Sequence, residues 1–135
     1  MSTFKVVENE FITLWYHPDH KIVHHKFHKK TIYGDPLRNA FNEGVALLQK
    51  HGANKWLSDD RENIIFRGED VEWLLKDWFP RAVQSGWKYW ALVNPEQAIG
   101  KLNMEQFTKD YTKQGITVKF FKNPDDAKEW LCCVE

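Results

Sequence analysis

Cysteine and net charge are what this chain most clearly lacks. Its two cysteines, Cys132 and Cys133, are neighbours, and neighbours cannot link distant elements through a disulfide. A reduced, cytoplasmic setting is therefore expected. The 19 Lys and Arg residues balance 19 Asp and Glu residues, so no global field gathers nucleic acid. We expect no nucleic acid among the partners.

Long apolar runs and glycine-rich loops are missing as well. No run approaches the roughly 20 apolar residues of a membrane span, and the first residues lack the basic-then-apolar form of a signal peptide. The seven glycines are scattered and form no phosphate loop, and no Gly-x-Ser-x-Gly elbow marks a nucleophilic serine. We therefore expect a chain that spans no membrane and carries no cofactor.

Aromatic residues, by contrast, are plentiful. Hydrophobic residues make up 42% of the 135 residues and aromatic residues 15%, including 7 Trp and 9 Phe. Such a chain can bury a large core without help from a metal or a disulfide, and its length suits one domain. We expect a single domain over residues 1–135.

Periodicity and turn residues predict alternating strands and helices. Runs rich in β-branched and aromatic residues predict strands at 11–16, 22–27, 55–60, 87–93 and 116–121. Apolar residues at helical spacing, with caps and glycine stops, predict helices after Pro36, from 69 to 85, after Asn103 and after Asn123. Pro80 lies inside the second helix, where we expect a kink or a break because proline donates no backbone hydrogen bond.

The resulting order, β-β-α-β-α-β-α-β-α, predicts an α/β fold. Helical connections between strands imply right-handed crossovers, so we expect a mostly parallel five-stranded sheet in sequential order, with the opening strand antiparallel at an edge. Ligands of such sheets bind beyond the carboxyl ends of the parallel strands. Function is therefore expected in the loops at 29–35, 59–68, 94–102 and 121–124.

The run Lys55-Trp-Leu-Ser-Asp-Asp-Arg-Glu-Asn63 leads straight into the second of these loops. Asp59 and Asp60 are adjacent, and adjacent residues on a strand point to opposite faces. They therefore cannot form a general acid and base dyad by spacing alone. One of them could act with Arg61, Glu62 or Asn63 from the loop, but we favour a structural role in which they cap backbone donors and hold Arg61 in a salt bridge.

Histidines crowd the first predicted hairpin and raise the question of a metal site. On a strand, His24 and His28 are about 13 Å apart, and His24 and His25 face opposite ways. Zinc bonds its nitrogen ligands at about 2.0–2.1 Å, so these residues cannot share one ion without other segments. Only His17 and His20, with Asp19 in the turn, could chelate an ion. We expect no metal and favour solvent-facing histidines whose protonation in mild acid would make this edge basic.

The second predicted helix carries a candidate partner surface. Trp73 lies about 100° round the helix from Leu74. Phe79 lies nearly opposite the stripe that buries Trp78, so at least one of Trp73 and Phe79 is expected to be exposed, near Arg81. An exposed aromatic ring beside an arginine suits a partner surface or the rim of a pocket.

With these residues identified, the chain resembles the small bacterial proteins described as SpoIIAA-like or STAS-like, a group related in fold to CRAL-TRIO lipid-binding domains. The residues that carry the resemblance are Trp56–Arg61, Glu69 and Asp70 with Trp73, Asp77–Arg81, Val93–Glu96, and 118–121 with Ala127, Trp130 and Leu131. They cover most of the chain, from Phe11 to Leu131. The resemblance implies a fold and a regulatory or binding role, and no established chemistry.

A phosphorylation switch is the activity that the resemblance most directly suggests. Anti-sigma-factor antagonists of the STAS class carry a phosphorylatable serine near the start of the helix after the third strand. Here that helix begins Arg67-Gly-Glu-Asp70, with no Ser or Thr. Ser58 is no ready substitute, because a phosphate would add about 1.5–2 negative charges beside Asp59 and Asp60. We favour a buried hydroxyl satisfied by backbone groups.

Three functions remain open on these grounds. The leading hypothesis is a non-enzymatic regulatory or protein-interaction module, with a protein partner or a second copy of the chain. The alternative is a binding domain for a small apolar or lipid-like ligand. A further alternative is an enzyme using Asp59 or Asp60. The candidate ligand- or partner-binding residues are Asp59, Asp60, Arg61, Asn63, Trp73, Trp78, Phe79, Arg81 and Glu96.

Overall fold

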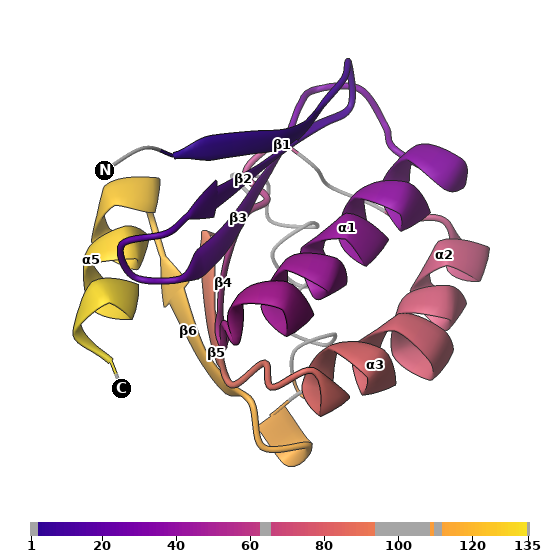
Figure 1. Ribbon diagram of the computed structural model, residues 1–135. Coiled ribbons are helices and arrows are strands. Elements are labelled where there is room, and N and C mark those ends of the chain that lie inside the picture. Colours follow the sequence, from indigo (N-terminus) through magenta and orange to yellow (C-terminus); the bar gives the residue numbers. More distant parts are fainter. Residues whose placement is uncertain (1–2, 63–65, 94–108, 110–111, 135) are drawn as a thin grey trace.

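The computed structural model describes residues 3–62, 66–93, 109 and 112–134. Over these residues the chain forms an α/β fold, in which one six-stranded mixed sheet carries helices on both faces (Figure 1). The strands are β1 (Phe4–Glu8), β2 (Ile12–His17), β3 (Ile22–Phe27), β4 (Lys55–Asp59), β5 (Tyr89–Val93) and β6 (Thr117–Phe121). They lie side by side in chain order. The predicted α/β class is confirmed.

The prediction of five strands was wrong, because β1 adds a sixth. β1 pairs antiparallel with β2, so β1 takes the sheet edge expected for β2. Most of β1 is exposed, and backbone pairing holds it in place more than burial does. The side chain of Asn9 shapes the turn into β2 by accepting hydrogen bonds from the backbone N–H groups of Phe11 and Ile12. A strand with so little burial leaves only a weak hydrophobic pattern.

The parallel half of the sheet is built from β3, β4, β5 and β6. Their carboxyl ends meet at one edge, where Asp59 lies between Lys26 of β3 and Val93 of β5. Asp60 extends β4 beyond its last strand residue, because its backbone N–H donates to the carbonyl oxygen of Val93 over 3.3 Å. The acidic pair therefore lies at the edge where α/β sheets bind their ligands.

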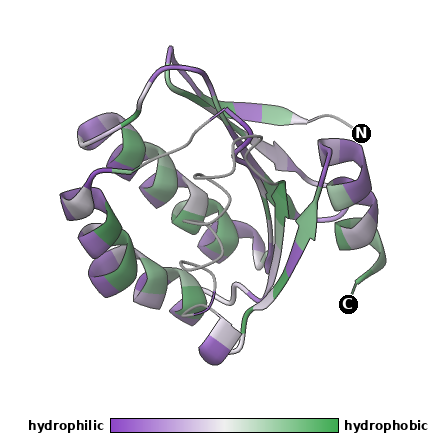
Figure 2. Cartoon of the chain, turned by 180° about the vertical axis from the view of Figure 1, so that it is seen from behind, coloured by the Kyte–Doolittle hydropathy of each residue, from purple (hydrophilic) through white to green (hydrophobic). Residues whose placement is uncertain are grey.

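Helices cover both faces of the sheet. The helices α1 (Asp35–His51), α2 (Gly68–Trp73) and α3 (Phe79–Gln84) lie on one face, and α5 (Pro124–Cys133) packs on the other against β4, β5 and β6 (Figure 1). Seen from behind, the apolar stripes of the helices turn toward the sheet (Figure 2). The helix expected at 103–115 lies mostly outside the described residues.

The predicted disturbance at Pro80 takes the form of a π-helical turn, η1 (Leu74–Trp78), between α2 and α3. Its widened geometry appears in the hydrogen bond from the Phe79 N–H to the carbonyl oxygen of Leu74, five residues back. Pro80 has no N–H to donate, and its ring would crowd the carbonyl four residues back in a regular α-helix. The helix therefore continues past the proline with one residue more per turn, and no loop interrupts it.

Candidate functional site

Alternation along β4 sends Trp56, Ser58 and Asp60 toward the helices α1 to α3, and Leu57 and Asp59 toward α5. Trp56 belongs to the larger core cluster, and Leu57 to the smaller cluster beneath α5. Both aspartates are buried, each 2% exposed. The prediction that Asp59 and Asp60 point to opposite faces is confirmed, and each has its own environment.

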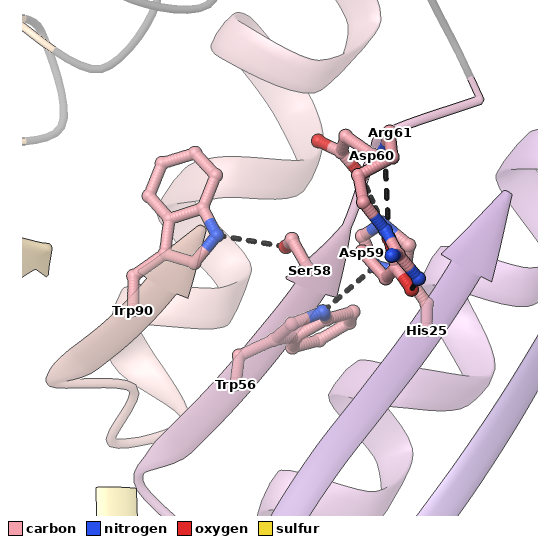
Figure 3. Close-up of polar contacts among 7 residues, drawn as sticks. All are labelled: His25, Trp56, Ser58, Asp59, Asp60, Arg61 and Trp90. Carbon is pink, nitrogen blue, oxygen red and sulfur yellow. Dashed lines mark hydrogen bonds and ion pairs between the residues drawn. The ribbon is translucent and has the colours of Figure 1, made fainter. Parts of the chain in front are cut away.

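Asp60 faces a buried histidine that the sequence did not single out. Its Oδ1 lies 2.7 Å from Nε2 of His25, and both side chains are 3% exposed. The other ring nitrogen of His25, Nδ1, lies 2.9 Å from the indole Nε1 of Trp56 (Figure 3). Three side chains from β3 and β4 thus form a buried chain of hydrogen bonds, from Trp56 through His25 to Asp60.

The indole of Trp56 determines how His25 is protonated. An indole N–H only donates, so Nδ1 of His25 must accept and carries no proton. His25 is therefore the neutral tautomer with its proton on Nε2, and this proton is donated to Asp60. The imidazole orients the carboxylate without supplying a positive charge to it.

The burial of Asp60 is unfavourable for its charged form. Burial is the largest influence on it and raises the pKa of its carboxyl group above the usual value, and the neighbouring Asp59 acts in the same direction. His25 lowers the pKa through its hydrogen bond, and would lower it further through its charge if it were protonated, but the shift stays upward. Over residues 3–62, 66–93, 109 and 112–134, no lysine or arginine pairs with Asp60.

Ser58 lies beside this pair but is not activated by it. Its Oγ accepts a 2.7 Å hydrogen bond from the indole N–H of Trp90, and it is 2% exposed. The predicted buried hydroxyl is confirmed, although an indole and not the backbone satisfies it. Both nitrogens of His25 are engaged elsewhere, so His25 cannot take a proton from Ser58. The two residues do not form a nucleophile and base pair.

A small cavity lies between the sheet and the helices, and these polar groups line it. Its free volume is about 20 Å³, and one water needs roughly 10–15 Å³ on this measure. The cavity therefore fits a single water-sized group. Among the described residues, the rest of its wall is aromatic apart from Leu74, and the rings belong to Phe27, Phe41, Trp56, Phe66, Trp78, Trp87 and Trp90.

On the other face of the sheet, Asp59 plays the structural role that was favoured for it. Arg61 binds it through two hydrogen bonds of 2.8 Å, from Nε to Oδ1 and from a terminal nitrogen to Oδ2. Burial alone raises the pKa of Asp59, but the hydrogen bonds and charge of Arg61 outweigh it and hold the pKa below the usual value. The predicted salt bridge to Arg61 is confirmed for Asp59 and absent for Asp60 among the described residues.

The predicted surface on the second helix is formed in part. Trp73 is half-buried, and the guanidinium groups of Arg38 and Arg81 lie 5.2 Å and 5.9 Å from its ring centre. Phe79 is 6% exposed and does not belong to this surface. The extra residue in the π turn rotates Phe79 toward the core, which α-helical periodicity could not reveal. Trp78 is buried, as predicted, and lines the cavity.

Two of the predicted binding residues, Asn63 and Glu96, lie outside the described residues. His24 and His25 point to opposite faces, as predicted. The expectation of solvent-facing histidines holds for His20, which is exposed, and was wrong for His25, in the core, and for His24, which is half-buried. Alternation from Val23 to Phe27 already placed His25 on the buried face.

His17 and His24 do not form the basic edge that was expected in mild acid. His17 and His24 pair across β2 and β3, with 3.0 Å between Nε2 of His17 and Nδ1 of His24. Burial lowers the pKa of His17 to about 4 and that of His24 to about 3, and the charge of Lys128 adds to both effects. Within the described residues, no three His, Cys, Asp or Glu side chains are grouped to hold a metal ion.

Comparisons with known proteins add no assignment to this geometry. No family model, no curated protein and no solved structure matches the chain. Among the described residues, none of the helices is long and apolar enough to cross a membrane. The functional argument therefore rests on the residues of the site.

Proposed function

We propose that this chain is a binding domain for a small molecule, which it holds in the aromatic cavity between the sheet and the helices α1 to α3. The observation that carries the proposal is Asp60. A buried carboxylate without a cationic partner among the described residues destabilises the fold, yet this one, at the carboxyl end of β4, lines a cavity. Polar groups whose burial destabilises the fold, and which line a cavity, are typical of ligand-binding sites.

The size of the cavity also limits which apolar or lipid-like ligand could bind. A free volume of about 20 Å³ accommodates one small group and not an acyl chain. A lipid would have to displace Trp78 or Phe41, whose rings pack 5.1 Å apart. We propose a domain of the SpoIIAA-like type on the strength of the sequence resemblance, with a ligand that places only its terminal group in the cavity.

Native mass spectrometry of the protein purified from its own host tests this proposal. Wild-type protein and the Asp59→Asn variant are expected to retain a small additional mass, since Asp59 faces away from the cavity. Asp60→Asn is expected to lose it. If all three proteins carry the same adduct, the mass is bound elsewhere and the cavity is not its site.

A regulatory or protein-interaction module is the second candidate, and Trp73 favours it. A half-buried indole lies between two arginines, which pair with Asp70 and Asp77, and it offers an apolar contact bordered by charged groups. Sedimentation velocity over a range of concentrations is expected to show association that Trp73→Ser weakens and Lys76→Ser, on the exposed side of η1, does not. If the wild type and both variants associate to the same extent, Trp73 does not belong to a self-association surface.

An enzyme remains the further alternative, and only Asp60 would serve it. Asp59 is held by Arg61 on the opposite face. Asp60 has a raised pKa and touches a cavity, as a general acid or base requires.

A further inference from the structure

Hydrogen-bond donors and acceptors are unequally available around the cavity. Four indole N–H groups belong to tryptophans that line it, and each donates to another partner. The donors and acceptors are Trp56 to His25 Nδ1, Trp78 to the Phe41 carbonyl oxygen, Trp87 to the Tyr89 carbonyl oxygen, and Trp90 to Ser58 Oγ. A ligand that needs donors, such as a carboxylate or a phosphate, finds no indole N–H left to bind it.

Acceptors, by contrast, remain. Asp60 uses Oδ1 to accept from His25, and no described residue donates to its Oδ2. Ser58 Oγ has two lone pairs and uses one for Trp90, and its O–H can itself donate. A carboxylate oxygen only accepts, so the ligand group at Asp60 is a donor of hydrogen bonds, and the volume of about 20 Å³ limits it to the size of a water molecule.

The charge of the cavity wall further limits the class of ligand. Asp60 has no lysine or arginine partner among the described residues, and the Trp56 hydrogen bond keeps His25 neutral. Aromatic rings form most of the remaining wall, and their faces attract a cation. A cation placed here would gain from both the carboxylate and the rings, and it would offset the cost of burying Asp60.

We propose that the cavity binds a protonated amine, with its ammonium group donating to Asp60 Oδ2 and Ser58 Oγ inside the aromatic wall. An ammonium ion and the –NH₃⁺ end of an organic amine share this chemistry, and both have the size that the cavity accepts. This inference rests on the proposed small-molecule function and names the class of its ligand.

Titration followed by ¹H–¹⁵N NMR of the indole N–H signals tests the inference. Methylammonium chloride and ammonium chloride are added separately, with potassium chloride at the same ionic strength as the control for charge and methanol as the neutral control of similar size. We expect saturable shifts of the Trp56 and Trp90 signals with an amine, and none with potassium or methanol. Tighter binding of methylammonium would identify an organic amine, and tighter binding of ammonium would identify the free ion.

Variants and pH separate the site from adventitious binding. Asp60→Asn retains an oxygen acceptor for His25 and removes the charge, so amine affinity should fall by at least about tenfold, which corresponds to about 1.4 kcal/mol. Asp59→Asn, on the other face, should change it far less. In the wild type, affinity should also fall on acidification, because protonation of Asp60 removes its charge while the amine stays charged.

The outcomes distinguish this inference from the proposed function. Saturable binding of methanol but not of an amine would overturn the ammonium assignment and leave a small-molecule site intact. Equal shifts with potassium chloride, equal affinity of wild type and Asp60→Asn, or no saturable shift with any probe would also overturn it. Native mass spectrometry then decides separately whether the cavity holds another ligand.

Discussion

The indole N–H of Trp56 donates to Nδ1 of His25 over 2.9 Å, and this contact sets the charge balance of the whole cavity. With Nδ1 accepting, His25 has one proton left, on Nε2, and gives it to Asp60. The pair His25 and Asp60 therefore carries at most the single negative charge of the carboxylate. A site built in this way accepts a cation or a proton and repels a second anion.

Removal of the Trp56 donor should change the surroundings of His25 Nδ1. In Trp56→Phe this atom loses the indole N–H that it accepts. ¹⁵N NMR of the imidazole is expected to show the proton on Nε2 and none on Nδ1 in the wild type, and a shifted Nδ1 signal in the variant. Trp90→Phe is the matched control, because its indole binds Ser58 and not His25. A proton on Nδ1 in the wild type would contradict the assignment.

The two neighbouring aspartates should affect stability with opposite signs. The folded-state pKa of Asp60 is raised, so its contribution to stability is fully present below the unfolded pKa and is lost as pH rises through the folded pKa. Asp60→Asn removes this loss and should unfold at an equal or higher urea concentration than the wild type at pH 7.5. A marked loss of stability in Asp60→Asn would show that the carboxylate is structural.

Asp59→Asn should behave in the opposite way. The folded-state pKa of Asp59 is lowered, so its stabilisation is present above the unfolded pKa and is lost as pH falls through the folded pKa. At pH 7 the variant should lose about 1–3 kcal/mol, because the bidentate contact with Arg61 is weakened. In urea unfolding this deficit should shrink as pH falls below the usual carboxyl pKa of 3.8. A deficit that stays constant on acidification would point to packing and not to charge.

The His17 and His24 pair should make the fold sensitive to acid. Both pKa values are lowered in the folded state, to about 4 and about 3, so the unfolded chain binds protons more readily below its ordinary histidine pKa of about 6.5. Stability should therefore be unaffected above that value and should fall as pH drops from it toward 4. Urea midpoints of His24→Phe should fall less over this range than those of the wild type. His20→Gln, in the exposed turn, should follow the wild type.

Sequence alternation predicted which face each site residue takes, but not its partner. The period of two along a strand separated Asp59 from Asp60 correctly, because it depends only on local backbone geometry. The partner of Asp60 is His25, 35 residues earlier, and strand register brings them together. Register depends on the packing of the whole sheet, so no local pattern contains it.

The misplaced Phe79 and the missed β1 have local physical causes. Helical periodicity assumes a constant rotation per residue, and the π turn before Pro80 breaks this assumption and turns Phe79 inward. β1 is mostly exposed and shows little of the alternation that identifies half-buried strands. Proline could signal a disturbance, but the choice between a kink and a π turn depends on tertiary packing.

Gly44 and Trp56 provide a direct test of how tightly the cavity wall is packed. A Cβ atom at position 44, on α1, would overlap the indole ring of Trp56. Gly44→Ala should therefore destabilise the protein by about 1–3 kcal/mol, although alanine favours helix more than glycine does. Gly68→Ala, where the added atom meets nothing within 4 Å, is the matched control and should be close to neutral.

A double-mutant cycle makes this prediction specific to the ring. In a Trp56→Phe background the smaller side chain relieves the overlap, so Gly44→Ala should cost less there than in the wild type, by urea unfolding at pH 7. Equal costs in both backgrounds would mean that the indole does not limit the space above α1. The cavity also borders Trp56, so the overlap should move the ring and shift its indole NMR signal. A stability loss without that shift would place the strain elsewhere in α1.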